Sequence, residues 1–247
     1  MNDVSSHLFT GNRLLSALPE AELAKLRPHL EPISLKIGTI LATSGDHITH
    51  CYFPTKGMIS LLSVTERGET IEVAYTGREG MAGLATILNG HEALYQMLVQ
   101  AATDCYVVDA HVVAQLFNSE PVFHKLLLRY VFALLKQMSQ TCVCNHFHTI
   151  EQRLCRWLTV MTERSENRRL TLTQEFLSHM LGVQRTSIGL VANTMQTKGI
   201  IRYSRGKIDV IDLDRLRQNA CECYRIVNAE YNSLYTQNGH FPGPSHI

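Results

Sequence analysis

Residues 171–196 read TLTQEFLSHMLGVQRTSIGLVANTMQ and carry the clearest structural signal in the chain. Thr173 is a favourable N-cap for a first helix, because its hydroxyl can accept a hydrogen bond from the backbone of the first turn. Gly182 comes where that helix must end, and glycine tolerates the left-handed conformation of a helix C-terminus. A second helix begins near Gln184 and has apolar residues at helical spacing. The segment therefore predicts two short amphipathic helices joined by a tight turn, which is a helix-turn-helix.

Polar side chains at the start of the second helix suit recognition of double-stranded DNA. A helix fits the major groove, and its first residues reach the edges of the bases. Arg185 can make the bidentate contact to guanine, and Gln184 the corresponding contact to adenine. Thr186 and Ser187 can hold a phosphate or a base. Gly189 allows a neighbouring helix or backbone to approach closely. An ordinary helical hairpin is the alternative interpretation of this segment taken alone.

The next segment, residues 199–211, reads GIIRYSRGKIDVI and predicts a short β-hairpin. Arg205 and Gly206 form its turn, and Arg202 and Lys207 flank the tip. A basic hairpin directly after a helix-turn-helix is typical of a wing that grips DNA phosphates. The predicted DNA-contacting residues are Thr173, Gln184, Arg185, Thr186, Ser187, Gly189, Lys198, Arg202, Arg205 and Lys207.

The formal net charge of +1 is the average of two unlike parts. Residues 1–148 carry 10 Lys and Arg against 13 Asp and Glu, whereas residues 149–247 carry 13 against 9. Within residues 153–207 the balance is 10 basic to 3 acidic side chains. Such asymmetry points to a polyanionic partner for the basic half, although a solvated basic face gives the same pattern.

Residues 31–116 have the sequence texture of a β domain. Eight of the 15 glycines lie between Gly38 and Gly90, and turns recur every 9 to 12 residues, which is typical of a small sandwich or barrel. Strands are expected at residues 48–53, 58–64 and 70–75, with a closing pair at 95–101 and 104–109, and one or two short helices are expected before them, over residues 12–30.

A long helix is predicted over about residues 122–146, because the chain has neither glycine nor proline between Pro121 and Gly182. Its apolar stripe can pack on the chain's own β domain or on a second copy across a two-fold axis, and both can hold on different faces. We favour the second copy and predict a homodimer. The predicted dimer contacts are Phe123, Leu127, Tyr130, Leu134 and Met138.

The chain is thus predicted to be an α+β protein with four segments. Residues 1–120 hold the short helices and the β domain, and residues 121–148 the long dimerisation helix. Residues 149–235 hold the winged helix-turn-helix domain, with a last helix over about 212–235. Residues 236–247 are expected to be a flexible tail.

This order of parts resembles the Crp/Fnr family of bacterial transcription regulators over about residues 14–211. In the family block a threonine is followed nine residues later by a glycine and then by an arginine that opens the recognition helix, and Thr173, Gly182 and Arg185 fit this pattern. The stretches FPTKGMI at 53–59 and GREGM at 77–81 are similar to the family's β-roll sensor. The resemblance implies a jelly roll like the cyclic-nucleotide-binding domain, and a homodimer on a near-palindromic double-stranded DNA operator. RNA polymerase is a further candidate partner.

The sequence departs from the family at positions that set specificity. Thr186 and Leu190 stand where catabolite-activator-like members carry a glutamate and a second arginine, so the DNA half-site is expected to differ. No arginine lies between Arg78 and Arg129, and no lysine between Arg78 and Lys125. A buried phosphate without a cation is costly, so cyclic AMP is not the expected effector.

The effector and any cofactor are left unknown. The first cysteine is Cys51, so the sequence does not support the iron–sulfur cluster that Fnr-like members hold near the N-terminus. The candidate effector-pocket residues are Arg78, Glu79, Gly80 and Met81.

Seven cysteines, an odd number spread over a long chain, argue against a disulfide scaffold. The segment CVCNHFH places Cys142 and His146, and likewise Cys144 and His148, four residues apart on a helix. The two pairs point in different directions, so one tetrahedral site cannot use all four. The CEC at residues 221–223 lacks the C-x-x-C spacing. We therefore predict no metal site, and leave open whether Cys142, Cys144 or His146 binds metal or senses redox change.

Composition and motifs disfavour several classes of protein. A chain with 45% hydrophobic and 18% charged residues is globular, and no apolar run approaches the ~20 residues of a membrane span. The N-terminus lacks a signal-peptide pattern, so we expect a cytoplasmic protein without a membrane partner. G-x-S-x-G, H-E-x-x-H and Walker motifs are absent, so we do not expect an enzyme. The rival hypothesis is a β-roll protein that binds a ligand or metal and uses its C-terminal helices for assembly only.

Overall fold

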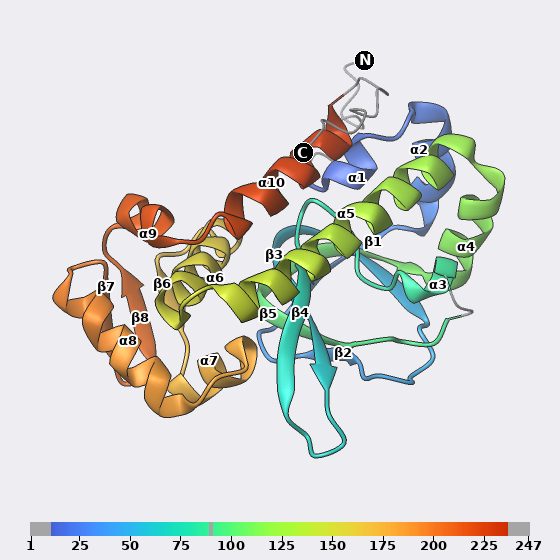
Figure 1. Cartoon of the computed structure of the whole chain (residues 1–247). Helices are drawn as coiled ribbons and strands as arrows, with labels where there is room; N and C mark the ends of the chain where they lie inside the picture. Colours follow the sequence, from blue (N-terminus) through green and yellow to red (C-terminus); the bar gives the residue numbers. More distant parts are fainter. Residues whose placement is uncertain (1–10, 89–90, 237–247) are drawn as a thin grey trace.

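The computed structural model of this chain describes residues 11–88 and 91–236. The β domain lies at one end of the molecule and the helix-turn-helix elements at the other, and one long helix runs between them (Figure 1). The predicted tail falls almost entirely outside the described residues. No helix among the described residues has the length and apolar character needed to cross a membrane.

The N-terminal half is an antiparallel β-roll preceded by short helices. Its sheet has the strand order β1-β5-β3-β4, and β2 pairs with β5. The elements are α1 (Arg13–Ser16), α2 (Glu20–Leu26), the 3-10 helix η1 (Arg27–His29), β1 (Glu31–Leu35), β2 (Ile40–Ala42), β3 (His50–Val64), β4 (Thr70–Thr76), α3 (Ala85–Leu88), β5 (Gln96–Asp109) and α4 (Ala110–Ser119).

The strand pattern corrects two predictions. The separate strands expected at 48–53 and 58–64 form one continuous strand, β3, and the pair expected at 95–101 and 104–109 forms one strand, β5. The β3–β5 ladder shifts register between Pro54 and Ile59 without ending. Gly57, with φ +84°, absorbs the extra residue of this bulge, which is why its glycine signal suggested a turn.

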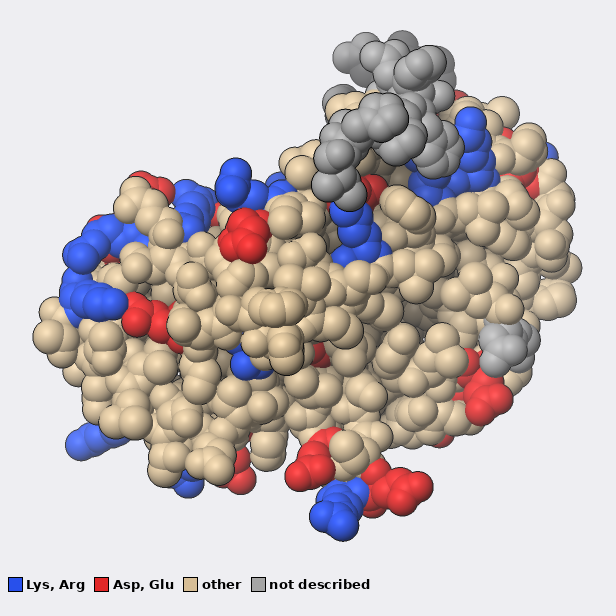
Figure 2. Space-filling model, in the orientation of Figure 1, with Lys and Arg blue, Asp and Glu red and all other residues tan. Residues whose placement is uncertain are grey.

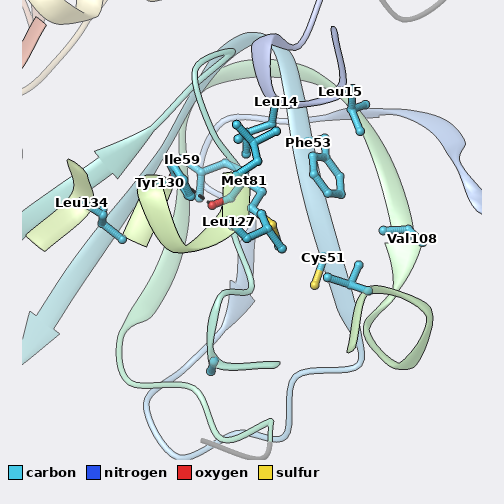
Figure 3. Close-up of a cluster of buried hydrophobic side chains, with 14 of the residues drawn as sticks. Leu14, Leu15, Cys51, Phe53, Ile59, Met81, Val108, Leu127, Tyr130 and Leu134 are labelled. Atoms are coloured by element: carbon cyan, nitrogen blue, oxygen red, sulfur yellow. Dashed lines mark hydrogen bonds between the residues drawn. The ribbon is translucent and has the colours of Figure 1, made fainter. Parts of the chain in front are cut away.

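The long helix α5 (Pro121–Phe147) packs its apolar face on the β-roll. Tyr130 is fully buried, and its hydroxyl is hydrogen-bonded to the Thr76 hydroxyl at 2.8 Å and donates to the Met81 carbonyl at 3.1 Å. Figure 3 shows Leu127, Tyr130 and Leu134 directed into the same cluster as Phe53 of β3.

The predicted dimer contacts are therefore wrong. Phe123, Leu127, Tyr130 and Leu134 are buried in the chain's own core, and Met138 packs against it. Both faces of α5 carry apolar residues. The residues that the sequence periodicity identified as dimer contacts lie on the face that packs on the β-roll. The outward face carries Leu128, Phe132 and Leu135, which are 45%, 58% and 58% exposed, and farther along Val143 and Phe147.

The C-terminal half forms a second core beneath a small three-stranded sheet of order β6-β8-β7. One helix predicted over 212–235 is in fact two, separated at residues 220–222. The elements are α6 (Ile150–Ser165), β6 (Arg169–Thr171), α7 (Gln174–Leu181), α8 (Arg185–Thr197), β7 (Ile201–Ser204), β8 (Lys207–Val210), α9 (Leu213–Asn219) and α10 (Cys223–Tyr235).

Helix α10 leaves the second core and runs beside α5 toward the β-roll (Figure 1). Val227, Tyr231 and Leu234 belong to the N-terminal core cluster. The Tyr231 hydroxyl donates to Gln137 Oε1 at 3.0 Å, and the Tyr235 hydroxyl donates to the Glu79 carbonyl. The last helix thus fastens the C-terminal half back onto the N-terminal half.

A buried polar network also joins the two halves. Glu72 of β4 accepts hydrogen bonds from Ser60 at 2.6 Å and from the Trp157 indole of α6 at 3.1 Å. Arg164 of α6 pairs with Glu79 at 2.7 Å. Burial raises the pKa of Glu72 to about 7, although these hydrogen bonds and the nearby Arg156 favour its charged form.

Candidate DNA-binding surface

The turn between α7 and α8 has the local geometry that its sequence predicts. The Thr173 hydroxyl accepts from the Phe176 amide at 3.0 Å and so caps α7. Gly182 ends the helix with φ +59°, and the Gly182 and Val183 amides bond to carbonyls of the last turn. The Thr173 hydroxyl is therefore engaged in capping α7. This capping role explains why the motif has a threonine at this position.

Helix α8 presents its first turn to solvent. Gln184 precedes the helix as its N-cap, and the side chains of Arg185 and Thr186 are exposed. Ser187 is half-buried. Arg185 forms no ion pair with any described residue, so its guanidinium is available to a ligand. The opposite face of α8 is buried through Ile188, Ala192 and Met195.

Gly189 serves packing within the helix-turn-helix. A Cβ atom at this position would lie 3.4 Å from the side-chain amide of Gln174 in α7. That spacing is at the short limit of an ordinary van der Waals contact, so the two helices already lie close together and a small residue suits the position. We assign Gly189 to helix packing and not to a DNA contact.

The wing is the β7–β8 hairpin. Arg205 and Gly206 both have positive φ, +48° and +74°, which is the two-residue turn that matches the twist of a hairpin. Arg202, Arg205 and Lys207 are exposed, and none forms an ion pair with a described residue. Asp209 lies near Arg202 and Lys207, but its carboxylate forms an ion pair with Arg169 at 2.6 Å. This ion pair lowers the pKa of Asp209. The wing tip therefore keeps its positive charge.

Lys198 does not join this surface. It is the C-cap of α8, about 20 Å along the helix from Arg185 at 1.5 Å per residue. Its ammonium pairs with Glu151 of α6 at 2.6 Å. Lys198 thus ties α8 to α6.

The basic excess of residues 153–207 is only partly a surface property. Arg153 and Arg156 are 6% exposed, and the Arg164 side chain is buried against Glu79. The sequence could not separate these internal cations from the exposed ones. Several exposed Lys and Arg side chains nevertheless lie at the end of the molecule that carries α8, α9 and the wing, in the left part of Figure 2.

One exposed apolar residue on α8, singled out in the sequence only as a departure from the family, joins the candidate DNA-binding surface. Leu190 is 71% exposed, one helical turn after Thr186 on the same face, and Asn193 and Thr194 follow it. An exposed leucine in the middle of a short helix indicates a binding surface, because apolar surface is unfavourable in water and is stabilised when a ligand covers it. In a major groove it can contact the methyl group of thymine.

The four candidate effector residues do not line a single pocket. Arg78 and Glu79 border a polar groove with Arg13 and Arg164, and Glu79 is committed to its ion pair with Arg164. Gly80 packs against the Tyr130 ring, which leaves no room for a side chain there. Met81 lines a different pocket.

That second pocket is apolar and lies between the β-roll and α5. Its walls include Met81, Leu84 and Tyr95 of the β domain and, from α5, Leu134, Leu135 and Met138. No lysine or arginine is among the described residues that line it. Leu135 belongs both to this wall and to the outward apolar face of α5.

Metal-ligating side chains also gather where α5 ends and α10 begins, on elements other than α8 and the wing. Cys142 and His146 are exposed and lie outside the cluster, whereas Cys144 and His148 lie beside the cysteines of the CEC segment. Sequence reasoning did not find this set, because each of the two segments supplies only two ligands and the segments are about 75 residues apart in the chain.

Two family models match the chain. A cyclic nucleotide-binding domain matches residues 32–120, and a Crp-like helix-turn-helix domain matches residues 152–219. A comparison with curated proteins finds no significant match.

Solved structures share this fold at low identity. A transcriptional regulator of the Crp/Fnr family from Eubacterium rectale is 18% identical with a TM-score of 0.68, and the match covers 85% of this chain and 98% of that one. FixK2 from Bradyrhizobium japonicum is 13% identical with a TM-score of 0.64, over 78% and 98%. The c-di-GMP-responsive regulator CLP from Xanthomonas campestris is 14% identical with a TM-score of 0.62, over 78% and 99%. The predicted fold, with a β-roll, a long helix and a C-terminal helix-turn-helix, is confirmed.

Proposed function

We propose that this chain is a DNA-binding transcription regulator of the Crp/Fnr family and works as a homodimer on a near-palindromic operator, because its two halves match a cyclic nucleotide-binding domain and a Crp-like helix-turn-helix domain. The observation that carries this proposal is the exposed first turn of α8, together with a wing tip whose cations form no ion pair with a described residue. These are the two parts that a winged helix needs, one for base edges and one for phosphates.

A two-fold dimer would use the outward face of α5. Leu128, Phe132 and Leu135 lie at four- and three-residue steps, so they form one stripe along the helix. Full burial of a leucine or phenylalanine side chain gives about 1.5–3 kcal/mol, so a pair of such stripes supplies a strong driving force. Two half-sites about one helical turn apart would then face the two α8 helices.

On each half-site, the proposed roles follow from position and chemistry. Arg185 reads guanine, and Gln184, Thr186 and Leu190 contact neighbouring bases or the thymine methyl. Arg202, Arg205 and Lys207 hold phosphates. Such a regulator works in the cytoplasm, and RNA polymerase is the further partner that activation would require.

We assign the effector role, if this β-roll has one, to the apolar pocket under α5 and not to the residues 78–81. An anionic cyclic nucleotide would be buried there without any lysine or arginine among the described lining residues, which is costly. A small uncharged apolar molecule suits these walls better.

The DNA-binding activity is tested first by titrating random-sequence duplex DNA at stepped salt concentrations. We expect measurable binding at low salt that weakens steeply as salt rises, because phosphate contacts release counterions. The double variant R205A/K207A should bind more weakly, and its slope of log K against log[salt] should fall by about 0.9 for each phosphate that the wing no longer neutralises.

The matched control removes two exposed cations from the β domain, in the double variant K36A/R67A. It should bind DNA like the wild type. If the wild type fails to bind even at the lowest salt, the regulator proposal is overturned. If both double variants weaken DNA binding equally, the loss comes from the reduced net charge, and the wing has no specific role in binding.

A further inference from the structure

Three cysteines and a histidine meet where α5 ends and α10 begins. Cys144 lies in the last turn of α5, and His148 is the C-cap of that helix. Cys221 lies in the link after α9, and Cys223 opens α10. Their three Sγ atoms and one ring nitrogen all lie within 4.8 Å of one another. All three cysteines of this cluster are buried.

The spacing suits one small ion. The Sγ atoms of Cys144 and Cys221 are 3.5 Å apart, and Cys223 Sγ is 3.4 Å from His148 Nδ1. In a tetrahedral zinc site, Zn–S bonds of about 2.3 Å and Zn–N bonds of about 2.0–2.1 Å separate neighbouring ligand atoms by about 3.5–3.8 Å. The donors therefore stand roughly one tetrahedron edge apart already. An iron–sulfur cluster needs a wider cage, because its cysteines bind different irons.

The histidine is oriented as a metal ligand. Its Nδ1 faces the cysteines, and its Nε2 lies 3.1 Å from Glu222 Oε1. A ligating histidine almost always donates its other ring N–H to a carboxylate, carbonyl or water, which fixes the ring and its tautomer. The Gln140 side-chain amide donates to Cys223 Sγ at 3.2 Å, which orients that sulfur as well.

The surrounding charge also fits. Zinc with three thiolates and a neutral imidazole carries a net charge of −1. Arg156 of α6 is buried and its Nε has no hydrogen-bond partner; Glu72 lies within its electrostatic reach, but Arg156 forms no direct ion pair with a carboxylate among the described residues. It lies within electrostatic reach of Cys144 and Cys221, as does Arg153. A thiolate site supplies the counter-charge that these internal cations require.

We propose that Cys144, His148, Cys221 and Cys223 form a mononuclear structural zinc site. Four protein ligands leave no open position, which is typical of structural and not of catalytic zinc. Binding releases the three thiol protons to water and leaves the zinc oxidation state unchanged. The site would clamp the end of α5 to the start of α10, at the joint between the long helix and the winged helix. This inference does not depend on the proposed DNA-binding function.

The test starts with the metal content of the full chain, purified with reductant and without added metal. Plasma mass spectrometry should find about one zinc per chain, as expected for a closed four-ligand site. The variants C221S and C223S should lose it. The matched control is C142S, because Cys142 is exposed on the same helix two residues from Cys144 and lies outside the cluster. It should keep the metal.

A variant at Glu222 separates coordination from folding. This side chain is half exposed and touches the site only through His148, so E222Q should fold normally. Its zinc affinity, measured by chelator competition, should fall by about 10- to 100-fold, the usual effect of losing such a supporting carboxylate. An affinity equal to that of the wild type would remove His148 from the proposed ligand set.

Cobalt gives a readout on the unmodified chain, in case the cysteine variants fail to fold. After chelation of zinc from the wild type, added Co²⁺ should produce the visible bands of tetrahedral cobalt and the near-ultraviolet charge transfer of cobalt–thiolate bonds. Octahedral cobalt bands without charge transfer, or no metal bound in either experiment, would overturn the proposal. So would a Cys144–Cys221 disulfide found by mass spectrometry of unreduced protein as the main form, because it would occupy two ligands.

Discussion

Arg185 is the residue on which the proposed base recognition depends. It opens α8, its side chain is exposed, and the other cation of the helix, Lys198, is engaged with Glu151. The variant R185A should weaken binding to the operator by about 1–3 kcal/mol and relax the preference at one base pair of each half-site. Fluorescence anisotropy on operators substituted at each position measures both effects.

The matched control for this variant is R67A, which removes an exposed arginine from the tip of the β3–β4 hairpin. It should leave the base preference unchanged. If R185A weakens binding equally for every base at every position, Arg185 holds a phosphate and does not read the sequence.

Glu72, which lies where the two halves of the chain meet, makes the folding stability depend on pH. Burial raises its pKa from about 4.5 to about 7 in the folded state, so the stability it contributes is fully present below pH 4.5 and is lost as the pH rises through 7. The loss is on the order of 3 kcal/mol by pH 8. The variant E72Q cannot ionise; its amide oxygen can still accept from the Trp157 indole and its amide nitrogen can donate to the Ser60 hydroxyl, so its Tm should exceed that of the wild type increasingly from pH 5 to pH 8.

Thermal unfolding of both proteins across this pH range provides the check. E66Q, at the exposed hairpin tip, serves as the control and should follow the wild type at every pH. A constant difference between E72Q and the wild type would show that Glu72 has the same pKa in the folded and the unfolded chain, so that burial does not raise it.

Single residues also show where prediction from sequence succeeds. Thr173, Gly182 and the Arg205-Gly206 turn behave as predicted, because capping and positive φ are local properties that the residue type decides. Lys198 could not be judged in this way, because its partner Glu151 is distant in sequence. The same holds for the Cys144–Cys221 contact, which joins two segments that each look too short for a site.

At the scale of elements, α5 shows the limit of hydrophobic periodicity. The helix is apolar on both faces, so spacing alone identified a face but not its partner. The β-roll takes one face, with Tyr130 hydrogen-bonded inside it, and leaves the other to solvent. The merged strands β3 and β5 have a similar cause, since Gly57 sits in a bulge of a ladder that continues past it.

The outward face of α5 carries the prediction at this scale. The variant F132D places a charge in the middle of the exposed stripe, where Phe132 is 58% exposed. A charge buried at a dimer seam without a partner is costly, so the variant should be monomeric where the wild type is dimeric, and should lose operator affinity. Light scattering coupled to size exclusion gives the mass.

Ile37 offers the comparison, because it is 63% exposed on the β domain and apart from α5. I37D should stay dimeric. A dimeric F132D, or a wild type that is monomeric at the concentrations of the binding assays, would contradict the proposed seam.

At the scale of the whole molecule, several contacts join the two halves, and three of them are specific polar contacts. The Glu72–Trp157 and Arg164–Glu79 contacts join α6 to the β-roll, and α10 returns along α5 to reach Glu79. The apolar pocket and the outward stripe share Leu135. A ligand in that pocket therefore touches the same helix that we propose as the dimer seam, which gives it a route to the spacing of the two α8 helices.

The fold order was predictable at this scale because each half carries its own signal, glycine-punctuated strands in one and the helix-turn-helix block in the other. The packing of α10 against the N-terminal half was not predictable. The sequence of α10 follows α9 directly, and nothing local indicates that its apolar face belongs to the N-terminal core.

The most direct test of the proposed regulator is selection from a random duplex DNA pool by the purified wild-type protein at near-physiological salt. The homodimer with two exposed α8 helices predicts an enriched site with two-fold symmetry, whose half-sites lie about one helical turn, roughly 34 Å, apart. A bound pool without an enriched sequence, or an enriched site without two-fold symmetry, would contradict it.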